Sequence, residues 1–520
     1  MPLLKFALPL AGTACRTTAL ALTAALLAGC GGGGGSGSIG GTPIGLPSSS
    51  SLAEICAAPR PTGATDPFTG ARYGDVQGTL ADEKAFLRSW IDETYLWYKD
   101  VRALPATTLN AALYATPSDY FAALKTPLTT ASGKPKDQFH FTYDTPTWVA
   151  LAQSGVSYGY GFQIALIAAV PPRSAVVAFT DPGTPATANA IARGAAIVTV
   201  DGVDLANGSD VATLNAGLFP TTAGAHTFVI HDLGAPANRT VTMTAQAITE
   251  TPVQNVMTLP APNNTVGYML FNDHIATSES ELVAAIGTLK AAGVTDLVLD
   301  IRYNGGGYLD IASELAYMIA GPANTAGKFF EREIYNDRNP FNQTTAQATT
   351  DFHANGEGFT VAAGTPLPNL GLNRVFVLTT GDTCSASEAI VNGLRGAGVT
   401  VTLVGGQTCG KPYGFFPRDN CNTTYFSIQF QGVNNVGFGD YADGFAPTCA
   451  VADDFTHQLG DPAEAQLDVA LGFRATGTCA PMFGNRPRGL SVQSELANVT
   501  HAGSVLVRSP FRENRIFRPQ

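Results

Sequence analysis

Residues 383–388 read Thr-Cys-Ser-Ala-Ser-Glu, and they stand where a predicted strand passes into a predicted helix. A serine at such a position, here Ser385, exposes its hydroxyl, while the first N–H groups of the helix point towards whatever reacts there. The spacing of Ser385 and Glu388 is also that of an ordinary helix capping box. Taken alone, the segment favours the cap over catalysis.

Lys411 changes this interpretation. It lies 26 residues after Ser385, in a Gly-Lys-Pro turn that ends the next predicted strand. The ends of adjacent strand–helix units can lie side by side, so the lysine can meet the serine. A lysine acts as the base for a serine only when burial lowers its pKa towards neutrality. Its uncharged neighbours suit such burial; they are Cys409, Gly410, Pro412, Tyr413 and Phe415.

The elements that must position these residues follow an α/β pattern from about Val266 onward. Strands are predicted at 268–271, 296–302, 374–379 and 399–404, and helices at 309–319 and 387–395. Strands that alternate with helices indicate a layered α/β core. The strand at 296–302 enters an Asn-Gly-Gly-Gly turn at 304–307, and a bare backbone turn of this kind can donate an N–H to an oxyanion.

A β-rich segment precedes this core, from about Gly155 to Ile248. Within it, Asp201-Gly202 is flanked by alternating apolar residues, which predicts a β-hairpin. The order of its pieces resembles a PDZ domain. The resemblance implies that the loop at Gly161 and Phe162 offers backbone N–H groups to a peptide carboxylate, while the peptide adds a strand to the sheet edge. Any small β domain with a tight turn is the alternative.

The N-terminal region is predicted to be helical. Apolar residues between Asp82 and Lys99 recur at helical spacing, and they indicate an amphipathic helix of a small domain. Trp90 and Trp97 fit its core better than a binding surface. No internal repeat is evident.

Three motifs now occur in order: Asp-Ile-Arg-x-Asn-Gly-Gly-Gly, then Ser-Ala-Ser-Glu, then Gly-Lys. With the PDZ-like unit upstream, the chain resembles the carboxyl-terminal processing (tail-specific) serine peptidases over roughly residues 80–475. The resemblance implies a crotonase-like α/β core that carries an inserted PDZ module. It makes Ser385 the nucleophile and Lys411 the general base. The oxyanion donors it implies are the N–H groups of Ala386 and of either Gly306 or Gly307.

The chain departs from the family pattern at three points. Many members have a glutamine four residues after the lysine, where this chain has Phe415, and a carboxylate eleven residues after the serine, where it has Gly396. The interval from serine to lysine is also one residue longer than usual. A third catalytic member is therefore unassigned; Glu388 is either that orienting residue or the partner of the cap, and the cap is slightly favoured.

Two rival nucleophile–base arrangements stay open. Among seven histidines, His274 is the best alternative base, because it follows a predicted strand near the core. Cys384 as nucleophile is weaker, because no histidine partner is evident. Six cysteines after Cys30 allow fifteen pairings. If Ser385 meets Lys411, Cys384 and Cys409 lie close enough for a disulfide; free thiols, or pairing with Cys421 and Cys449, are the alternatives.

The first thirty residues predict export. A basic start, an uncharged stretch of thirteen residues and Leu-Ala-Gly-Cys at 27–30 resemble a bacterial lipoprotein signal with lipidation at Cys30; an ordinary signal peptide is the alternative. No other run of eighteen apolar residues occurs, so the chain is expected to be anchored, not to span a membrane. No Asp follows Cys30, which favours the outer membrane within a bacterial cell envelope. Export also permits disulfides.

Composition excludes several classes of partner. The formal charge of −11, with only 14% charged residues, argues against nucleic acid. No Cys-x-x-Cys pair or His-Glu-x-x-His motif supports a zinc site, and no organic cofactor is implied. Residues 481–520 hold six Arg against Glu495 and Glu513. We expect this tail to be a solvated extension; docking into the active-site groove is the less favoured alternative.

The sequence thus predicts an anchored serine endopeptidase, with a PDZ-like domain that selects polypeptide segments, either chain ends or unfolded stretches. A catalytically inactive, PDZ-bearing peptide-binding scaffold is the main alternative, and a crotonase-like enzyme with a non-peptide acyl substrate is a weaker one. The predicted segments are a signal peptide at 1–29, a Gly/Ser-rich tether at 30–52, a helical domain at 53–150, a PDZ-like domain at 155–248, a catalytic core at 250–478 and a basic extension at 479–520.

Overall fold

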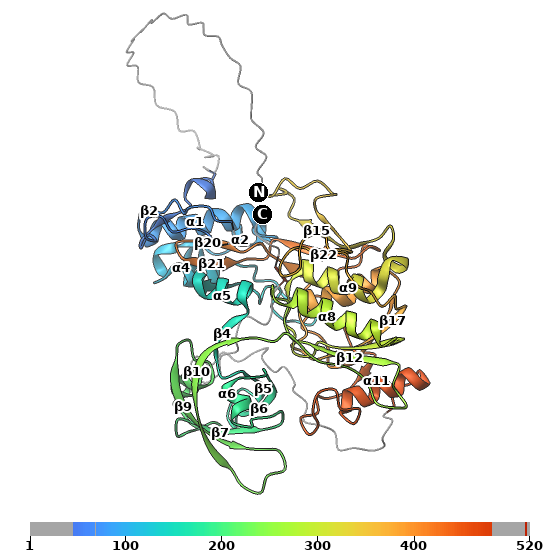
Figure 1. Ribbon diagram of the computed structural model, residues 1–520. Coiled ribbons are helices and arrows are strands. Elements are labelled where there is room, and N and C mark those ends of the chain that lie inside the picture. Colours follow the sequence, from blue (N-terminus) through green and yellow to red (C-terminus); the bar gives the residue numbers. More distant parts are fainter. Residues whose placement is uncertain (1–44, 68, 481–514, 517–520) are drawn as a thin grey trace, which may run out of the picture. The chain divides into compact units, whose positions relative to one another are not determined.

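The computed structural model describes residues 45–67, 69–480 and 515–516 (Figure 1). The predicted signal peptide, Cys30 and most of the tether lie outside the described residues. So does the basic extension, apart from 479–480 and 515–516. Within the described ranges, no helix has both the length and the apolar character that a membrane crossing requires.

The N-terminal region is helical, as predicted. Thr79 and Asp82 form a capping box at the start of its main helix, α1. The helix stops at Thr94, short of the predicted Lys99, because the Leu96 N–H donates to the carbonyl of Ile428 and turns the chain. Trp90 is buried in this domain's core, as expected. Its elements are η1 (Ser49–Ser51), β1 (Ile55–Cys56), β2 (Val76–Gln77), α1 (Leu80–Thr94), α2 (Tyr98–Arg102), α3 (Ala106–Leu109), η2 (Ala111–Leu113), α4 (Pro117–Ala123), β3 (Phe141–Asp144) and α5 (Thr145–Ser154).

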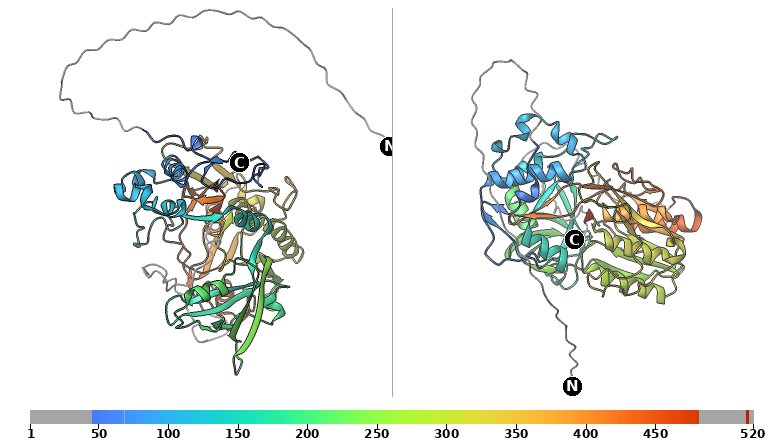
Figure 2. Two further views of the ribbon diagram at one scale, coloured as in Figure 1. Left: turned by 90° about the vertical axis from the view of Figure 1, so that its left-hand side faces the viewer. Right: turned by 90° about the horizontal axis from the view of Figure 1, so that it is seen from above.

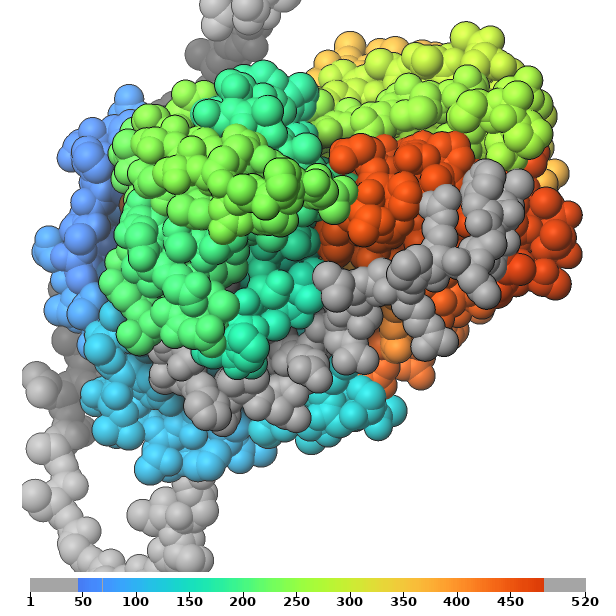
Figure 3. All heavy atoms as spheres, turned by 90° about the horizontal axis from the view of Figure 1, so that it is seen from below, coloured from blue at the N-terminus to red at the C-terminus, as the bar shows by residue number. Residues whose placement is uncertain are grey.

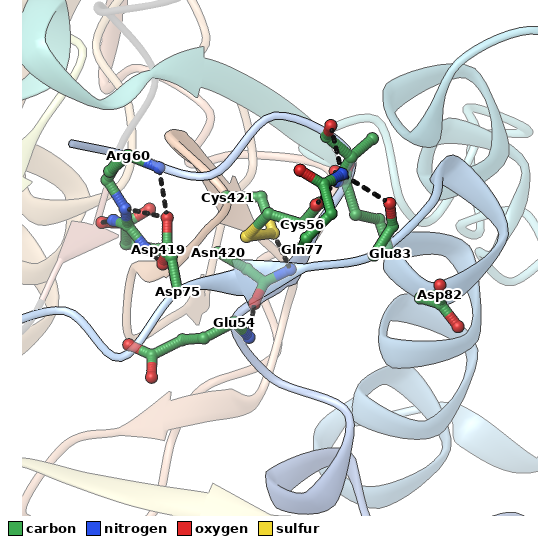
Figure 4. Close-up of a disulfide and its surroundings, with 12 residues drawn as sticks. Glu54, Cys56, Arg60, Asp75, Gln77, Asp82, Glu83, Asp419, Asn420 and Cys421 are labelled. Carbon is green, nitrogen blue, oxygen red and sulfur yellow. Dashed lines mark hydrogen bonds and ion pairs between the residues drawn. A yellow bond between two sulfur atoms is a disulfide. The ribbon is translucent and has the colours of Figure 1, made fainter. Parts of the chain in front are cut away.

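A disulfide fastens this region to a distant hairpin of the chain (Figure 4). Cys56 is bonded to Cys421, 365 residues later. Beside it, Arg60 forms ion pairs with Asp75 and Asp419, each at 2.6 Å. The covalent bond and the ion pairs together hold the N-terminal segment against the part of the chain that follows Lys411.

The β-rich segment forms a seven-stranded sheet in the order β4-β10-β9-β7-β6-β5, with β8 paired to β7. The hairpin at Asp201-Gly202 is confirmed: both residues have positive φ, 49° and 80°, and β7 and β8 pair across them. The elements are β4 (Val156–Gly159), β5 (Phe162–Ala168), β6 (Ser174–Thr180), α6 (Pro185–Ala188), β7 (Ala196–Val200), β8 (Val203–Asp204), α7 (Val211–Leu218), β9 (Gly224–His231) and β10 (Arg239–Thr249).

The layered α/β core is confirmed. Its main sheet has the order β11-β12-β13-β17-β18-β23, and the five strands from β12 to β23 are parallel. Its elements are β11 (Val253–Thr258), β12 (Val266–Phe271), α8 (Ser278–Ala291), β13 (Asp296–Asp300), β14 (Gly307–Tyr308), α9 (Leu309–Thr325), β15 (Phe329–Tyr335), β16 (Thr349–Asp351), β17 (Arg374–Thr379), α10 (Ala386–Gly396), β18 (Thr400–Gly405), β19 (Tyr413–Gly414), β20 (Arg418–Asn420), β21 (Thr423–Phe426), β22 (Phe430–Val433), β23 (Cys449–Ala450), α11 (Ala465–Thr476) and β24 (Arg515–Ile516).

Helices cover both faces of this sheet (Figures 1 and 2). Successive strand residues point to opposite faces. Thus Leu297 and Leu299 of β13 pack with residues of α8, α9 and α10, while Val298 between them packs with α11. Because both faces are covered, the strands are continuously apolar, which is why their positions could be predicted well from the sequence.

Smaller sheets extend the core. One has the order β16-β15-β22-β19, and another the order β20-β21-β3, so the N-terminal region and the core share a sheet. The β-rich domain is joined to the core by buried charges: Arg193 lies 2.5 Å from Asp453, which also pairs with Arg302 at 2.8 Å. In Figure 3 the green surface of the β-rich domain borders the orange-red surface of the C-terminal part of the core.

Candidate active site

Three loops that the sequence singled out leave one edge of the main sheet. β17 pairs in parallel with β18, Leu378 opposite Val404, and β13 pairs with the other side of β17. Ser385 follows β17, Lys411 follows β18, and the glycine turn follows β13. The carboxyl ends of adjacent parallel strands open onto a common crevice. The fold therefore brings the three predicted motifs to one place.

Ser385 occupies the turn between β17 and α10. Its side chain is fully buried, and its backbone has φ 60° and ψ −113°, a conformation that few non-glycine residues adopt. Surrounding hydrogen bonds hold this strained turn. The Cys384 N–H and the Ser387 hydroxyl both donate to the carbonyl of Asn304, at 3.1 and 3.0 Å.

Lys411 is also fully buried, between aromatic rings. Its Nζ lies 4.3 Å from the ring centroid of Phe415 and 4.7 Å from that of Phe139. Phe415, at the position where the sequence resemblance implied a glutamine, thus forms a wall of the lysine site. Phe139 comes from the N-terminal region, and nothing in its local sequence indicates this role.

Cys384 and Cys409 form a disulfide, with Cα atoms 5.2 Å apart. The expectation that these two cysteines lie together is confirmed, and the alternatives are wrong: Cys421 pairs with Cys56, and Cys449 with Cys479. The bond ties the residue before Ser385 to the residue two before Lys411. It also removes Cys384 as a nucleophile, because a disulfide sulfur carries no thiolate.

Those two sulfurs and a carboxylate oxygen of Glu388 are close enough together to be ligands for a metal ion. A metal ion binds cysteine sulfurs as thiolates, and in the Cys384–Cys409 disulfide neither sulfur is a thiolate. The Glu388 carboxylate also accepts hydrogen bonds from backbone N–H groups and from the Thr408 hydroxyl.

Glu388 accepts hydrogen bonds from the loops of both candidate catalytic residues. Its Oε2 accepts from the N–H groups of Ser385 and Lys411, at 3.0 and 2.8 Å. Its Oε1 accepts from the N–H of Gly410 at 2.9 Å and from the Thr408 hydroxyl at 2.5 Å. Burial raises the pKa of Glu388, and these bonds oppose that effect. The residue is thus more than the partner of a helix cap: it fixes the backbone around the candidate base. Thr408 was not singled out in the sequence.

The glycine turn is organised by the Asn304 side chain. Its Oδ1 accepts from the Gly306 N–H at 3.0 Å and contacts His274 Nδ1 at 2.9 Å. The expectation that Gly306 supplies an oxyanion donor is corrected, since that N–H already has an acceptor. Gly307 remains, together with Ala386, whose N–H at the first position of α10 has no acceptor within the helix. The order of the motif, with Asn before the glycines, was the only sequence signal for Asn304.

His274, the alternative base, lies against this turn. Burial lowers its pKa to about 3, which makes its imidazole a weak proton acceptor. Because Asn304 Oδ1 can only accept, Nδ1 carries the imidazole proton. The His274 carbonyl accepts from the Tyr308 N–H at 2.8 Å and lies 2.3 Å from the place that a Cβ on Gly307 would occupy. Gly307, with φ 138°, therefore has to be glycine.

The predicted peptide-binding loop lies in the β-rich domain. Gly161 has φ 78°, its carbonyl accepts from the Asp181 N–H at 2.7 Å, and Phe162 begins β5, the last strand of the sheet. A terminal strand has one side open for pairing. This placement of Gly161 and Phe162 is compatible with addition of a peptide strand to β5. The predicted lipidation site, Cys30, lies outside the described residues.

Comparison with known proteins gives two family matches. Residues 265–428 match Peptidase family S41, and residues 82–143 match the Peptidase S41 N-terminal domain. The first range contains Asn304, Ser385 and Lys411; the second ends inside β3.

Named relatives agree with these matches. The chain is 30% identical over 251 residues to the chloroplastic C-terminal processing peptidase of Tetradesmus obliquus, covering 46% of this chain and 48% of that one. It is 27% identical over 268 residues to a carboxyl-terminal-processing protease of Picosynechococcus, covering 50% and 56%. The match thus spans about half the length of these curated relatives.

A solved structure shares the fold. The crystal structure of an S41 protease from Bacteroides fragilis superimposes with a TM-score of 0.58 at 23% identity, covering 76% of this chain and 97% of that one. The family matches and the named relatives thus place two parts of the chain, residues 82–143 and 265–428, with peptidase family S41 and the carboxyl-terminal processing peptidases, and the solved structure shows a shared fold.

Proposed function

We propose that this chain is a serine endopeptidase that hydrolyses peptide bonds through an acyl-enzyme, with Ser385 as nucleophile and Lys411 as general base. One observation carries the proposal: Ser385 and Lys411 are both fully buried, follow neighbouring parallel strands, and are tied together by the Cys384–Cys409 disulfide and by Glu388. A lysine with only a structural role does not need to be buried and held beside a buried serine in this way.

The reaction follows from these positions. Lys411 Nζ takes the hydroxyl proton as Ser385 Oγ attacks the peptide carbonyl carbon, which gives a tetrahedral oxyanion. The Ala386 and Gly307 N–H groups donate to that oxyanion. When the carbon–nitrogen bond breaks, the lysine returns the proton to the leaving amine, and an ester on Ser385 remains. Water, deprotonated in turn by Lys411, hydrolyses the ester.

The polypeptide substrates enter as chain ends or unfolded segments, and the β-rich domain selects them as a PDZ-type module through Gly161 and Phe162. The open side of β5 supports this role. We place the protein in a bacterial cell envelope, anchored through Cys30. The resemblance of residues 27–30 to a lipidation site and the three disulfides support that location.

The test compares the parent protein with Ser385→Ala and Lys411→Ala on an unstructured protein substrate. Exposed Ser280→Ala and Lys290→Ala are the matched controls. We expect cleavage by the parent and both controls and by neither site variant. A fluorophosphonate should label the parent at Ser385. Cleavage that survives Lys411→Ala would move the base elsewhere; a parent that binds peptides but neither cleaves nor reacts with the label would support the scaffold instead.

A further inference from the structure

Two residues near the end of the chain form a strand at the candidate active site. β24, Arg515–Ile516, pairs in parallel with β14, so that Arg515 lies opposite Gly307 and Ile516 opposite Tyr308. β14 begins at the glycine that is the candidate oxyanion donor. The strand therefore lies directly beside the proposed reaction centre.

The backbone of β14 pairs on two sides, with β24 on one and with His274 on the other. On its other side it forms a bridge with His274, in which the His274 N–H donates to the Gly306 carbonyl and the Tyr308 N–H donates to the His274 carbonyl. In an extended chain, successive residues direct their N–H and C=O groups to opposite sides. The peptide groups of Gly307 thus face away from His274, towards β24.

β24 also lies beside β19, Tyr413–Gly414, which starts two residues after Lys411. The strand therefore contacts both the element of the oxyanion turn and the element that follows the candidate base. An extended polypeptide substrate that pairs with the Gly307 peptide groups would lie along β14 in the same place.

We propose that β24 is an intramolecular ligand of the active site: it occupies the position of the substrate strand and blocks the site until a polypeptide substrate displaces it and pairs with β14 instead. This inference rests on the proposed peptidase function. Addition of a strand to a free edge is sequence-tolerant, because the backbone supplies the bonds. A segment of the same chain competes well even when its intrinsic affinity is low, because its effective concentration is high.

The charge of the surrounding tail supports the contact. Residues 481–520 hold six Arg and two Glu, whereas the whole chain has a net charge of −11. A basic segment is attracted to an acidic body, and this attraction weakens with salt. Displacement should consequently become easier as ionic strength rises.

The test measures how fast a fluorophosphonate labels Ser385 in the purified full-length protein, in a variant truncated after Asn514, and in Ile516→Pro. Proline removes the N–H that strand pairing needs, and Ile516→Val, which keeps it, is the matched control. A segment that fills the site nine tenths of the time slows labelling about tenfold. We therefore expect about tenfold faster labelling in the truncated and proline variants and no change in the control. Equal rates in all four proteins would overturn the proposal.

A binding measurement separates this proposal from the catalytic one. A fluorescent peptide with the sequence of residues 511–520 is added to Ser385→Ala protein, with and without residues 515–520. We expect the peptide to bind the truncated protein and to be excluded from the full-length one, whether or not the parent is an active peptidase. Equal binding to both, or to neither, would refute the intramolecular ligand even if Ser385 is catalytic.

Discussion

The backbone N–H of Lys411 donates to Glu388 Oε2 at 2.8 Å, and the same oxygen accepts from the N–H of Ser385 at 3.0 Å. One carboxylate atom thus holds the main chain of both the candidate nucleophile and the candidate base. The side chain is fully buried, so water cannot replace these bonds. The Glu388 carboxylate thus fixes the relative position of the two loops.

Glu388→Gln should therefore impair catalysis without removing either reacting group. The new amide NH₂ would face backbone N–H groups, and unpaired buried donors cost about 1–3 kcal/mol. We expect a lower unfolding free energy, slower fluorophosphonate labelling and a fall in kcat greater than the rise in KM. Glu281→Gln is the matched control, since Glu281 also accepts a backbone N–H, that of Val253, away from the site, and the single amide oxygen of glutamine can still accept this one bond. Normal labelling of the Glu388→Gln variant would show that the carboxylate positions nothing.

The disulfides provide a second prediction with an internal control. Cys384–Cys409 closes 25 residues of chain and Cys449–Cys479 closes 30. Because loop entropy depends weakly on length, losing either bond should cost a similar amount, about 3–4 kcal/mol. Only the first borders Ser385 and Lys411. We expect both double Cys→Ala variants to melt at similarly reduced temperatures, but only the 384/409 variant to label slowly. Equal labelling rates in the two variants would show that the Cys384–Cys409 disulfide contributes to stability and not to the positions of Ser385 and Lys411.

Much of this site could be predicted from the sequence, because its candidate residues directly follow the ends of predicted strands. The strand at 374–379 and the helix after Ser385 lie within a residue or so of their predicted positions, since continuous apolar runs and a capping pattern mark them. Phe139 and Thr408 could not be predicted, and the position of β24 corresponds only to the less favoured expectation for the tail. Each reaches the site through contacts between residues far apart in sequence, and nothing in its local pattern differs from ordinary core or loop residues.

Gly307→Ala tests the oxyanion turn. A methyl group there would lie 2.3 Å from the His274 carbonyl, in a backbone conformation that disfavours side chains. The turn has to move, and its N–H with it, so labelling and cleavage should fall by about 100-fold or more. Gly293→Ala is the control, because Gly293 also has positive φ, 69°, but nothing within 4 Å of the added methyl group. It should lower stability by about 1 kcal/mol and leave labelling unchanged. Full activity in the Gly307→Ala variant would assign the donor elsewhere.

Glu314 predicts how stability depends on pH. Burial, followed by the nearby carboxylates of Glu279 and Asp310, raises its pKa to about 9 from a usual 4.5. Between these values the folded protein holds a proton that the unfolded chain has released. The unfolding free energy should therefore be greatest at the acidic end of this window and fall as pH rises, by up to about 1.4 kcal/mol per pH unit from this group.

Glu314→Gln keeps the shape of the neutral side chain and should flatten this decline in unfolding free energy. Glu250→Gln, at a partly exposed residue, should leave the decline unchanged. Urea unfolding at pH 5.5, 7 and 8.5 measures the slope. If the Glu314→Gln variant loses stability as steeply as the parent across this range, the decline comes from other groups and Glu314 is not the buried proton carrier.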